Sequence, residues 1–294
     1  MVIGSVETLI QLARDNNCTI GQAMVKQEAA LKQISEEAVL EQMKYNWQVM
    51  KESIATGINH PQKSKGGLIG GEGRKLYDYC KGEQSLLCGK QVMEAVSYAL
   101  AVAEVNATMG RIVACPTAGS CGIVPGVLKK LQEMDELSDD QIAMALMTCA
   151  GFGMVIAHRA SVSGATGGCQ AECGAASAMA AAAAVELRGG TPEQAGEACA
   201  MVLKNVMGLV CDPVAGLVEV PCAKRNALGA SLAMVMADMA LAGITSVIPV
   251  DEVITAMGAV GRSLPESLRE TARGGLATTP TGQEFNRKIF GLDH

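Results

Sequence analysis

Cysteine is the residue type in this sequence with the greatest capacity for chemistry. Eleven cysteines occur among 294 residues, an odd number that cannot all be paired within one chain. The first ten residues, MVIGSVETLI, lack the basic start and long apolar run of an export signal. We therefore expect a cytoplasmic protein whose thiols stay reduced, with metal binding or thiol chemistry ahead of disulfide formation.

Six of the cysteines lie where a shared site is feasible. Two pairs are close in sequence, one of them separated by a single helical turn, and two further cysteines lie in segments that contain Pro and Gly. These are Cys115 with Cys121, Cys169 with Cys173, and the single Cys211 and Cys222. Cys149 and Cys199 lie in apolar helical sequence and are expected to pack as small hydrophobic residues. Zinc-ribbon, thioredoxin and ferredoxin spacings are absent, so spacing alone does not select metal ligands.

Glycine is concentrated in four segments, 65–73, 116–122, 163–174 and 211–216. Most of them also carry Ser, Thr or Cys beside apolar helical sequence. The backbone N–H groups of such loops at helix N-termini bind anions, which favours a ligand site over the alternative of tight turns between helices. The sequence contains no phosphate-binding loop and no dinucleotide fingerprint, so a nucleotide cofactor is not expected.

Helices must position these loops, because helix signals recur along the whole chain. Residues 175–187, AASAMAAAAAVEL, have a very high helix propensity. Runs of β-branched residues that could form strands are limited to 111–114 and 245–250. Helix starts are predicted from the capping patterns at Thr19, Ser138, Thr191 and Ser263. We predict a mainly α protein with one compact domain over 1–294. About 1–60 would form an outer helical layer and 61–294 a core that carries the glycine-rich loops.

Composition excludes some classes of partner. The net charge is −6 without a cluster of Lys and Arg, and aromatic residues are 3% of the chain, so nucleic-acid binding is not expected. Two apolar segments, 142–157 and 227–250, raise the question of membrane insertion. The first is short, and the second carries Asp238 and is built largely of Ala, Gly, Ser and Met. We interpret both as core helices and expect no membrane association.

Several long motifs, taken together and in order, resemble the iron–sulfur-dependent bacterial L-serine dehydratases, specifically their α chain or α domain. The resemblance covers nearly the whole chain from about residue 20. The motifs are SKGGLIGGEG (64–73), ACPTAGSCGIVPGVL (114–128), SGATGGCQAECGAASAMAA (163–181), CDPVAGLVEVPCAKRN (211–226) and ATTPTG (277–282).

This resemblance implies a [4Fe–4S] cluster that is held by three cysteines and leaves one iron open. Matched motif by motif, the ligands fall on Cys169, Cys211 and Cys222. The open iron would act as a Lewis acid on the hydroxyl of L-serine, giving pyruvate and ammonia without pyridoxal phosphate. The substrate would contact residues of the first two motifs, for each of which a capping or turn role is the alternative: Ser64, Lys65, Thr117 and Ser120.

The general base is not evident from the residues. The sequence has only three histidines: His158, which is expected to be structural at a helix C-terminus, the terminal His294, and His60 near the SKGG motif. Lys65 is the catalytic candidate of this chain, provided that burial lowers its pKa. The resemblance implies another source, a β part that completes the site and supplies histidines. We therefore expect the α subunit of a two-chain, oligomeric enzyme of amino-acid degradation.

Two other interpretations remain open. Cysteine desulfidases share several of these motifs and would eliminate sulfide in place of water. A non-catalytic iron–sulfur or small-molecule-binding protein would need neither the glycine-rich substrate loops nor a β partner. Because no cysteine follows Cys222, we predict no C-terminal thiol that caps the open iron.

Overall fold

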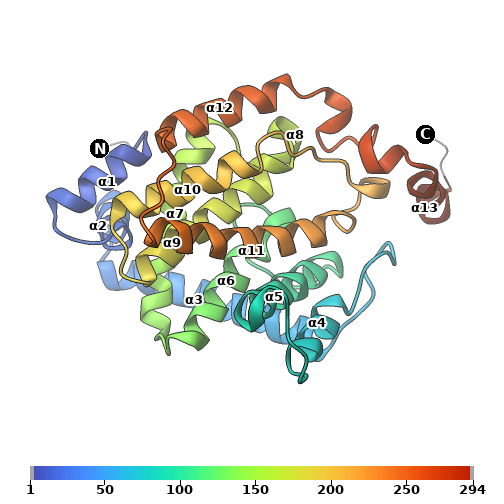
Figure 1. The fold of residues 1–294 in the computed structure, drawn as a ribbon, viewed down its shortest axis with the longest axis horizontal. Coiled ribbons are helices and arrows are strands. Elements are labelled where there is room, and N and C mark those ends of the chain that lie inside the picture. Colours follow the sequence, from blue (N-terminus) through green and yellow to red (C-terminus); the bar gives the residue numbers. More distant parts are fainter. Residues whose placement is uncertain (1–2, 292–294) are drawn as a thin grey trace.

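A helix made almost entirely of alanine lies at the centre of the molecule. The computed structural model describes residues 3–291, and within them α9 (Ala175–Leu187) has every residue from Ala175 to Val185 buried. Helices α7, α10, α11 and α6 pack around it (Figure 1). Because alanine side chains are short, these neighbours approach the axis of α9 closely, and they bury the loops at its N-terminal end.

The fold is mainly α, as predicted, and forms a single compact domain. Residues 3–291 contain thirteen α-helices and no β-strand; the one isolated β-bridge joins Cys211 and Arg269. The helices that surround α9 or extend from it are α1 (Val6–Asp15), α2 (Ile20–Lys32), α3 (Glu36–Asn59), α4 (Glu72–Cys80), α5 (Gly89–Ala107), α6 (Ile123–Met134), α7 (Asp139–Arg159), α8 (Gly164–Gly167), α10 (Pro192–Asn205), α11 (Cys222–Leu241), α12 (Val250–Ser263) and α13 (Pro280–Phe290).

Three of the four predicted helix starts are confirmed. Thr19, Ser138 and Thr191 each form a complete capping box with the Gln three residues later. The prediction at Ser263 is wrong, because this residue ends α12. Its hydroxyl donates to the Val260 carbonyl at 2.7 Å, back toward the last turn of its own helix.

Neither β-branched run forms a strand. In 245–250 the backbone of Ser246 is bonded to side chains of α10 instead of to another strand. Its N–H donates to the Glu197 carboxylate, and its carbonyl accepts from Lys204 Nζ at 2.5 Å. With those groups satisfied, the segment remains a loop between α11 and α12.

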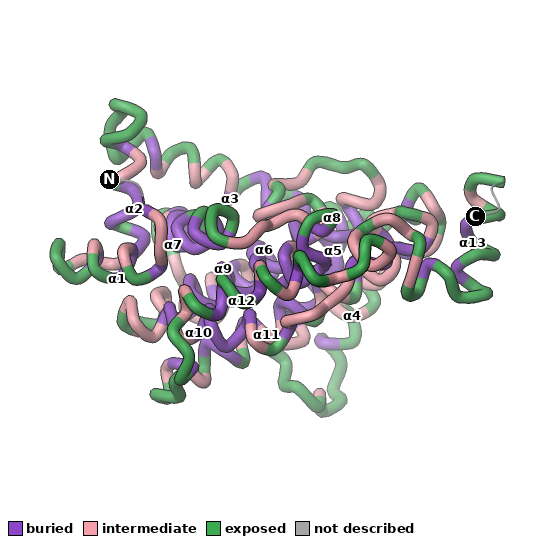
Figure 2. Tube along the Cα trace, turned by 90° about the horizontal axis from the view of Figure 1, so that it is seen from above, coloured by how far each residue is buried: buried purple, intermediate pink, exposed green. Residues whose placement is uncertain are grey.

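The two apolar segments are placed differently. Residues 142–157 lie inside α7, which is long and apolar enough to cross a membrane by length and composition, although 67% of its apolar window is buried inside the molecule. Residues 227–250 do not form one helix, since α11 ends at Leu241 and α12 begins at Val250. Figure 2 shows buried residues concentrated in the central helices and exposed ones at the connections.

Within 3–60, the chain forms α1, α2 and α3. Gln33, in the left-handed conformation, separates α2 from α3. The inner faces of these helices join the same core as α7 and α9, with Leu9 and Trp47 fully buried. The indole N–H of Trp47 donates to Asp139 Oδ1 at 3.0 Å, which fixes α3 against the start of α7.

Candidate metal centre

Hydrogen bonds between distant segments connect three of the glycine-rich segments, 65–73, 116–122 and 163–174, to one another or to the chain around Cys222. Ser64 donates to Glu219, and Thr117 Oγ1 donates to Glu172 Oε1 at 2.9 Å. The N–H of Gly122 donates to Asn226 Oδ1 at 2.9 Å. These acceptors lie beside the segments that carry the predicted ligands, so each loop is tied to a neighbour of a cysteine.

The three predicted ligands occupy three different local structures. Cys169 directly precedes a π-helical turn, η2 (Gln170–Gly174), which runs into α9. Cys222 is the first residue of α11, where unpaired N–H groups favour a thiolate. Cys211 lies in extended chain: its N–H donates to Leu268 O at 2.9 Å and its carbonyl accepts from the N–H of Glu270 at 2.7 Å.

A buried glutamine fixes the turn that carries Cys169. Gln170 Nε2 donates to the Met257 carbonyl at 3.1 Å, and Gln170 Oε1 accepts from the N–H of Gly208 at 2.8 Å. The side chain therefore links η2 to α12 and to the chain after α10. A turn bonded on two sides holds the direction of the adjacent cysteine.

The thiols are close enough to change one another's ionisation. A hydrogen bond from Cys173 holds the pKa of the Cys169 thiol below its usual value, and the positive charge of Arg225 adds to this effect. Burial raises the pKa of Cys222 to about 12 and also raises that of Cys211, and the charge of Cys169 contributes to both. The structure thus groups the three predicted ligands together with Cys173.

Other cysteines lie in separate surroundings. Cys115 and Cys121 form a buried pair on the loop before α6, and burial raises the pKa of each to about 12. Cys149 and Cys199 are fully buried within α7 and α10, where they pack in the core.

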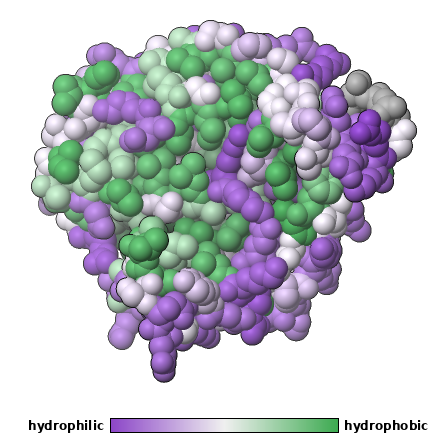
Figure 3. All heavy atoms as spheres, turned by 45° about the vertical axis from the view of Figure 1, so that its right-hand side comes forward, coloured by the Kyte–Doolittle hydropathy of each residue, from purple (hydrophilic) through white to green (hydrophobic). Residues whose placement is uncertain are grey.

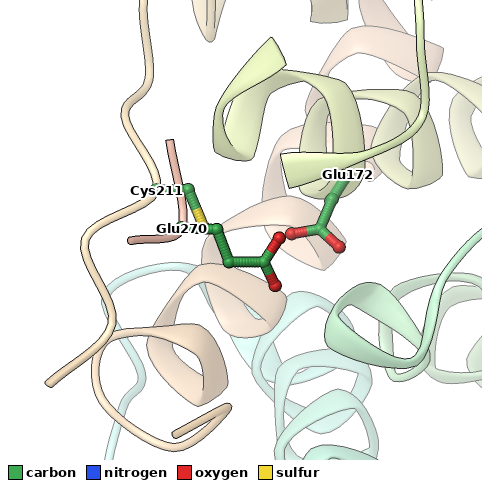
Figure 4. Close-up of side chains that lie close together, drawn as sticks. All are labelled: Glu172, Cys211 and Glu270. Atoms are coloured by element: carbon green, nitrogen blue, oxygen red, sulfur yellow. The ribbon is translucent and has the colours of Figure 1, made fainter. Parts of the chain in front are cut away.

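Two carboxylates that the sequence analysis missed face this group. Glu172, from η2, and Glu270, after α12, point their carboxylates toward one another beside Cys211 (Figure 4). One oxygen of each and the Cys211 sulfur lie within 4.8 Å of one another, a spacing that also suits a single metal ion. Burial raises the pKa of Glu172, and the Thr117 hydroxyl opposes this rise. A Cβ on Gly164 would lie 2.5 Å from Glu172 Oε2, so glycine leaves room for the carboxylate.

A buried ion pair borders the same group. Arg225 Nη2 contacts Asp212 Oδ1 at 2.8 Å, and Asp212 Oδ2 accepts from the N–H of Leu276. The sequence signal for both residues was their position next to a cysteine motif, in CDPVAG and in PCAKRN.

The SKGG loop is fixed by Glu219, three residues before Cys222. The buried Ser64 hydroxyl donates to Glu219 Oε2 at 2.6 Å, and the N–H of Gly66 donates to Glu219 Oε1 at 2.7 Å. A Cβ on Gly66 would lie 2.9 Å from that carboxylate. The Ser64 hydroxyl is therefore engaged in holding the loop. The side chain of Lys65 is exposed. A lysine that acts as a general base is expected to be buried, and this chain does not bury Lys65.

Thr117 and Ser120 differ in their exposure to solvent. Thr117 is half-buried and contacts both Glu172 and, at 3.2 Å, the Ser120 hydroxyl. Ser120 is fully buried within the turn before α6. Of the four predicted substrate contacts, Thr117 is the one whose side chain is hydrogen-bonded to Glu172.

The histidines lie elsewhere. His60 ends α3 and lines a cavity of about 240 Å³ together with Glu104 and Arg111, and no cysteine lines that cavity. His158 is exposed in the last turn of α7, and His294 lies outside the described residues.

The fold and the site together define a class of protein: a mainly helical chain whose glycine-rich loops bring thiols together beside two carboxylates. The sequence profile of the serine dehydratase alpha chain family matches residues 15–277. The chain belongs to this family.

Similar proteins support the assignment over nearly the full length. The chain is 52% identical to the probable L-serine dehydratase alpha chain of Bacillus subtilis, across 98% of this chain and 95% of that protein. It is 41% identical to the L-serine dehydratase alpha chain of Peptoniphilus asaccharolyticus, across 98% and 99%. The L-serine dehydratase of Streptomyces coelicolor is 37% identical across 92% of this chain, which covers only 60% of that longer protein.

Proposed function

We propose that this chain is the α subunit of an iron–sulfur L-serine ammonia-lyase, which converts L-serine to pyruvate and ammonia. The observation that supports it best is the convergence of Cys169, Cys211 and Cys222 from three separate segments onto one group, in which Cys169 and Cys211 are buried and Cys222 is half-buried. The names of full-length relatives, which are L-serine dehydratase alpha chains, point to the same activity.

The donor set fits a [4Fe–4S] cluster. Thiolates are the ligands that such clusters take, and here three of them come with a neighbouring guanidinium that offsets negative charge. When bound, the cluster would supply an open iron that acts as a Lewis acid on the substrate hydroxyl. Cys173 remains as a further thiol, hydrogen-bonded to Cys169.

The other side chains suit an amino acid as the substrate. The carboxylates of Glu172 and Glu270 can accept hydrogen bonds from its ammonium group, and Thr117 orients Glu172. The backbone N–H groups of the glycine-rich loops would bind the substrate carboxylate. In this arrangement Ser64 positions the SKGG loop, and Lys65 is available at its surface.

We further propose that a second chain completes the site and supplies the base. His60 and His158 are exposed, no cysteine lines the cavity at His60, and Lys65 is exposed as well. The longer single-chain relative has room for an additional part. Helix α11, which begins at Cys222, exposes Leu228 and Val235, and Figure 3 shows a broad apolar area on one face of the molecule. Such surfaces mark protein interfaces.

Anaerobic reconstitution with iron and sulfide tests the proposal. The wild type should take up about four iron atoms per chain, and Cys169→Ser, Cys211→Ser and Cys222→Ser should each abolish the visible charge-transfer absorption. Cys149→Ser and Cys199→Ser are matched controls, because these thiols are buried but lie inside helices. Uptake of a single iron would instead favour an ion held by Glu172, Cys211 and Glu270, and no uptake would refute the proposal.

Turnover then separates the activities. With the cluster in place and the second chain added, L-serine should yield pyruvate. If L-cysteine were consumed with release of sulfide while L-serine was not, the chain would be a desulfidase. A cluster without turnover of either substrate would favour a binding or sensing role.

A further inference from the structure

One arginine contacts all three segments that carry the predicted ligands. Arg225 lies on α11, three residues after Cys222, and its side chain is 12% exposed. Its guanidinium donates to Asp212 Oδ1 and to the Val210 carbonyl, both at 2.8 Å. These two residues flank Cys211, so the arginine fixes the chain on both sides of that ligand.

The same guanidinium reaches the third cysteine. It lies beside Cys169, to which it is hydrogen-bonded, and α11 packs against η2, the turn that Cys169 directly precedes. The Cys169 turn, the Cys211 segment and the start of α11 therefore share one cation.

We propose that Arg225 is the positioning residue of the thiol centre: it holds the three cysteine segments together before metal is bound, and supplies the positive charge that the bound group requires. The second half of this proposal rests on the proposed function, whereas the first half concerns the metal-free chain. Arg225 touches ligands and their neighbours, so its effect on the reaction is indirect.

The chemistry of arginine suits this role better than that of lysine. A planar guanidinium donates in several fixed directions at once, so one side chain can bind a carboxylate, a carbonyl and a sulfur together. A lysine keeps the charge but concentrates its donors on one atom. Outer residues that orient metal ligands typically contribute 10- to 100-fold to metal affinity.

Hydrogen exchange on the metal-free chain tests the positioning role. The N–H groups of Cys211 and Glu270 are bonded to Leu268 O and Cys211 O, and should be protected in the wild type. Arg225→Met should speed their exchange by about 10-fold or more, and Arg225→Lys should give an intermediate effect. Amides of α9 report on overall folding and should be unchanged. Lys224→Met is the matched control, because Lys224 is exposed on the same helix and pairs with Glu72.

Anaerobic reconstitution with iron and sulfide tests the second half of the proposal, that Arg225 supplies the positive charge that the bound group requires. Arg225→Met should reduce iron affinity by about 10-fold or more, and any cluster that forms should have a lower reduction potential, because a nearby positive charge favours the reduced state. Arg225→Lys keeps the positive charge but not the planar set of donors. Its reduction potential should therefore stay closer to the wild-type value than its iron affinity does. The Lys224→Met variant should match the wild type in both measurements.

The outcomes separate this inference from the proposed function. If the wild type binds no iron but Arg225→Met still releases the Cys211 segment, the cluster is refuted and the positioning role stands for the metal-free chain. If exchange, iron affinity and potential are all unchanged in Arg225→Met, the inference is wrong while the cluster stands. Faster exchange throughout α9 would show a general folding role and would also overturn it.

Discussion

Ser64 and Glu219 are 155 positions apart in the sequence, yet the Ser64 hydroxyl donates to Glu219 Oε2 at 2.6 Å, and both side chains are buried. Because Glu219 lies three residues before Cys222, this bond fixes the distance between the SKGG loop and one predicted ligand. The bond gives Ser64 a structural reason to be a serine, independent of any contact with substrate.

Replacing Ser64 with Ala should therefore destabilise the fold. The Glu219 carboxylate loses a donor in a buried position, which costs about 1–3 kcal/mol. Urea denaturation would measure this loss. Ser53→Ala is the control, because its buried hydroxyl bonds only to Met50 of the same helix, so it should cost less. An unchanged midpoint, together with a raised KM for serine, would instead assign Ser64 to substrate binding.

Thr117→Val should impair turnover more than stability. The hydroxyl that hydrogen-bonds Glu172 opposes the burial that raises the pKa of this carboxyl, so without it the pKa rises further. Hydrogen bonds to charged groups contribute about 1.5–3 kcal/mol, which corresponds to a fall in kcat/KM of about 10-fold or more. Steady-state assays of the complete enzyme would show it. Thr117→Ser retains the hydroxyl and should retain most activity; equal activity in the Val variant would exclude a role for this contact.

Glu104→Gln should change how stability depends on pH. Glu104 Oε1 accepts from the N–H of Glu72 at 2.6 Å, Oε2 has no hydrogen-bond partner, and burial raises the pKa of this carboxyl above 4.5. A raised folded-state pKa means that the protonated acid favours the folded state. Its contribution is therefore complete below about pH 4.5 and is lost as pH rises through the folded-state pKa.

Urea unfolding of the wild type and of Glu104→Gln between pH 4 and 8 would test this sign. The free energy of unfolding of the wild type should fall relative to that of the variant as pH rises above about 4.5. Glu52→Gln, an exposed carboxylate beside the same cavity, is the control. Parallel curves for the wild type and Glu104→Gln would contradict the prediction.

The cysteines should differ widely in reactivity. Cys88 is exposed, whereas Cys149 and Cys199 are fully buried, and burial raises the pKa of each buried thiol. A thiol-specific reagent should therefore modify Cys88 first in the native chain and reach the other two only on unfolding. Mass spectrometry of peptides from a time course would locate the labels. Cys88→Ser should remove the fastest phase, and early labelling of Cys149 would contradict the packing of α7.

Local signals predicted much of the fold. The capping boxes at Thr19, Ser138 and Thr191, and the alanine-rich α9, depend on residues within a few positions of one another, so the sequence alone is sufficient. Ser263 was mispredicted because α12 continues to this residue, whose hydroxyl bonds back to Val260. Ser246 was unpredictable for a different reason: its partners, Glu197 and Lys204, lie on another helix.

The candidate site was predictable only in part. The cysteines and glycine-rich loops stand out by residue type and motif. Glu172 and Glu270 become a pair only when η2 and the segment after α12 meet, and nothing near either residue indicates the other. The same holds for Arg225 and Asp212, whose ion pair depends on how α11 starts. The exposure of Lys65 was likewise not predictable, since a motif position does not indicate burial.

The backbone hydrogen bonds of Cys211 also imply an order of events during synthesis. Its backbone partners are residues 268 and 270, and Asp212 beside it is bonded to Leu276. A chain emerging from the ribosome presents Cys169, Cys211 and Cys222 well before those residues exist, because synthesis proceeds from the N-terminus. The segment of Cys211 therefore acquires its native backbone partners only after residues 268–270 have been synthesised, and the proposed site is incomplete until then.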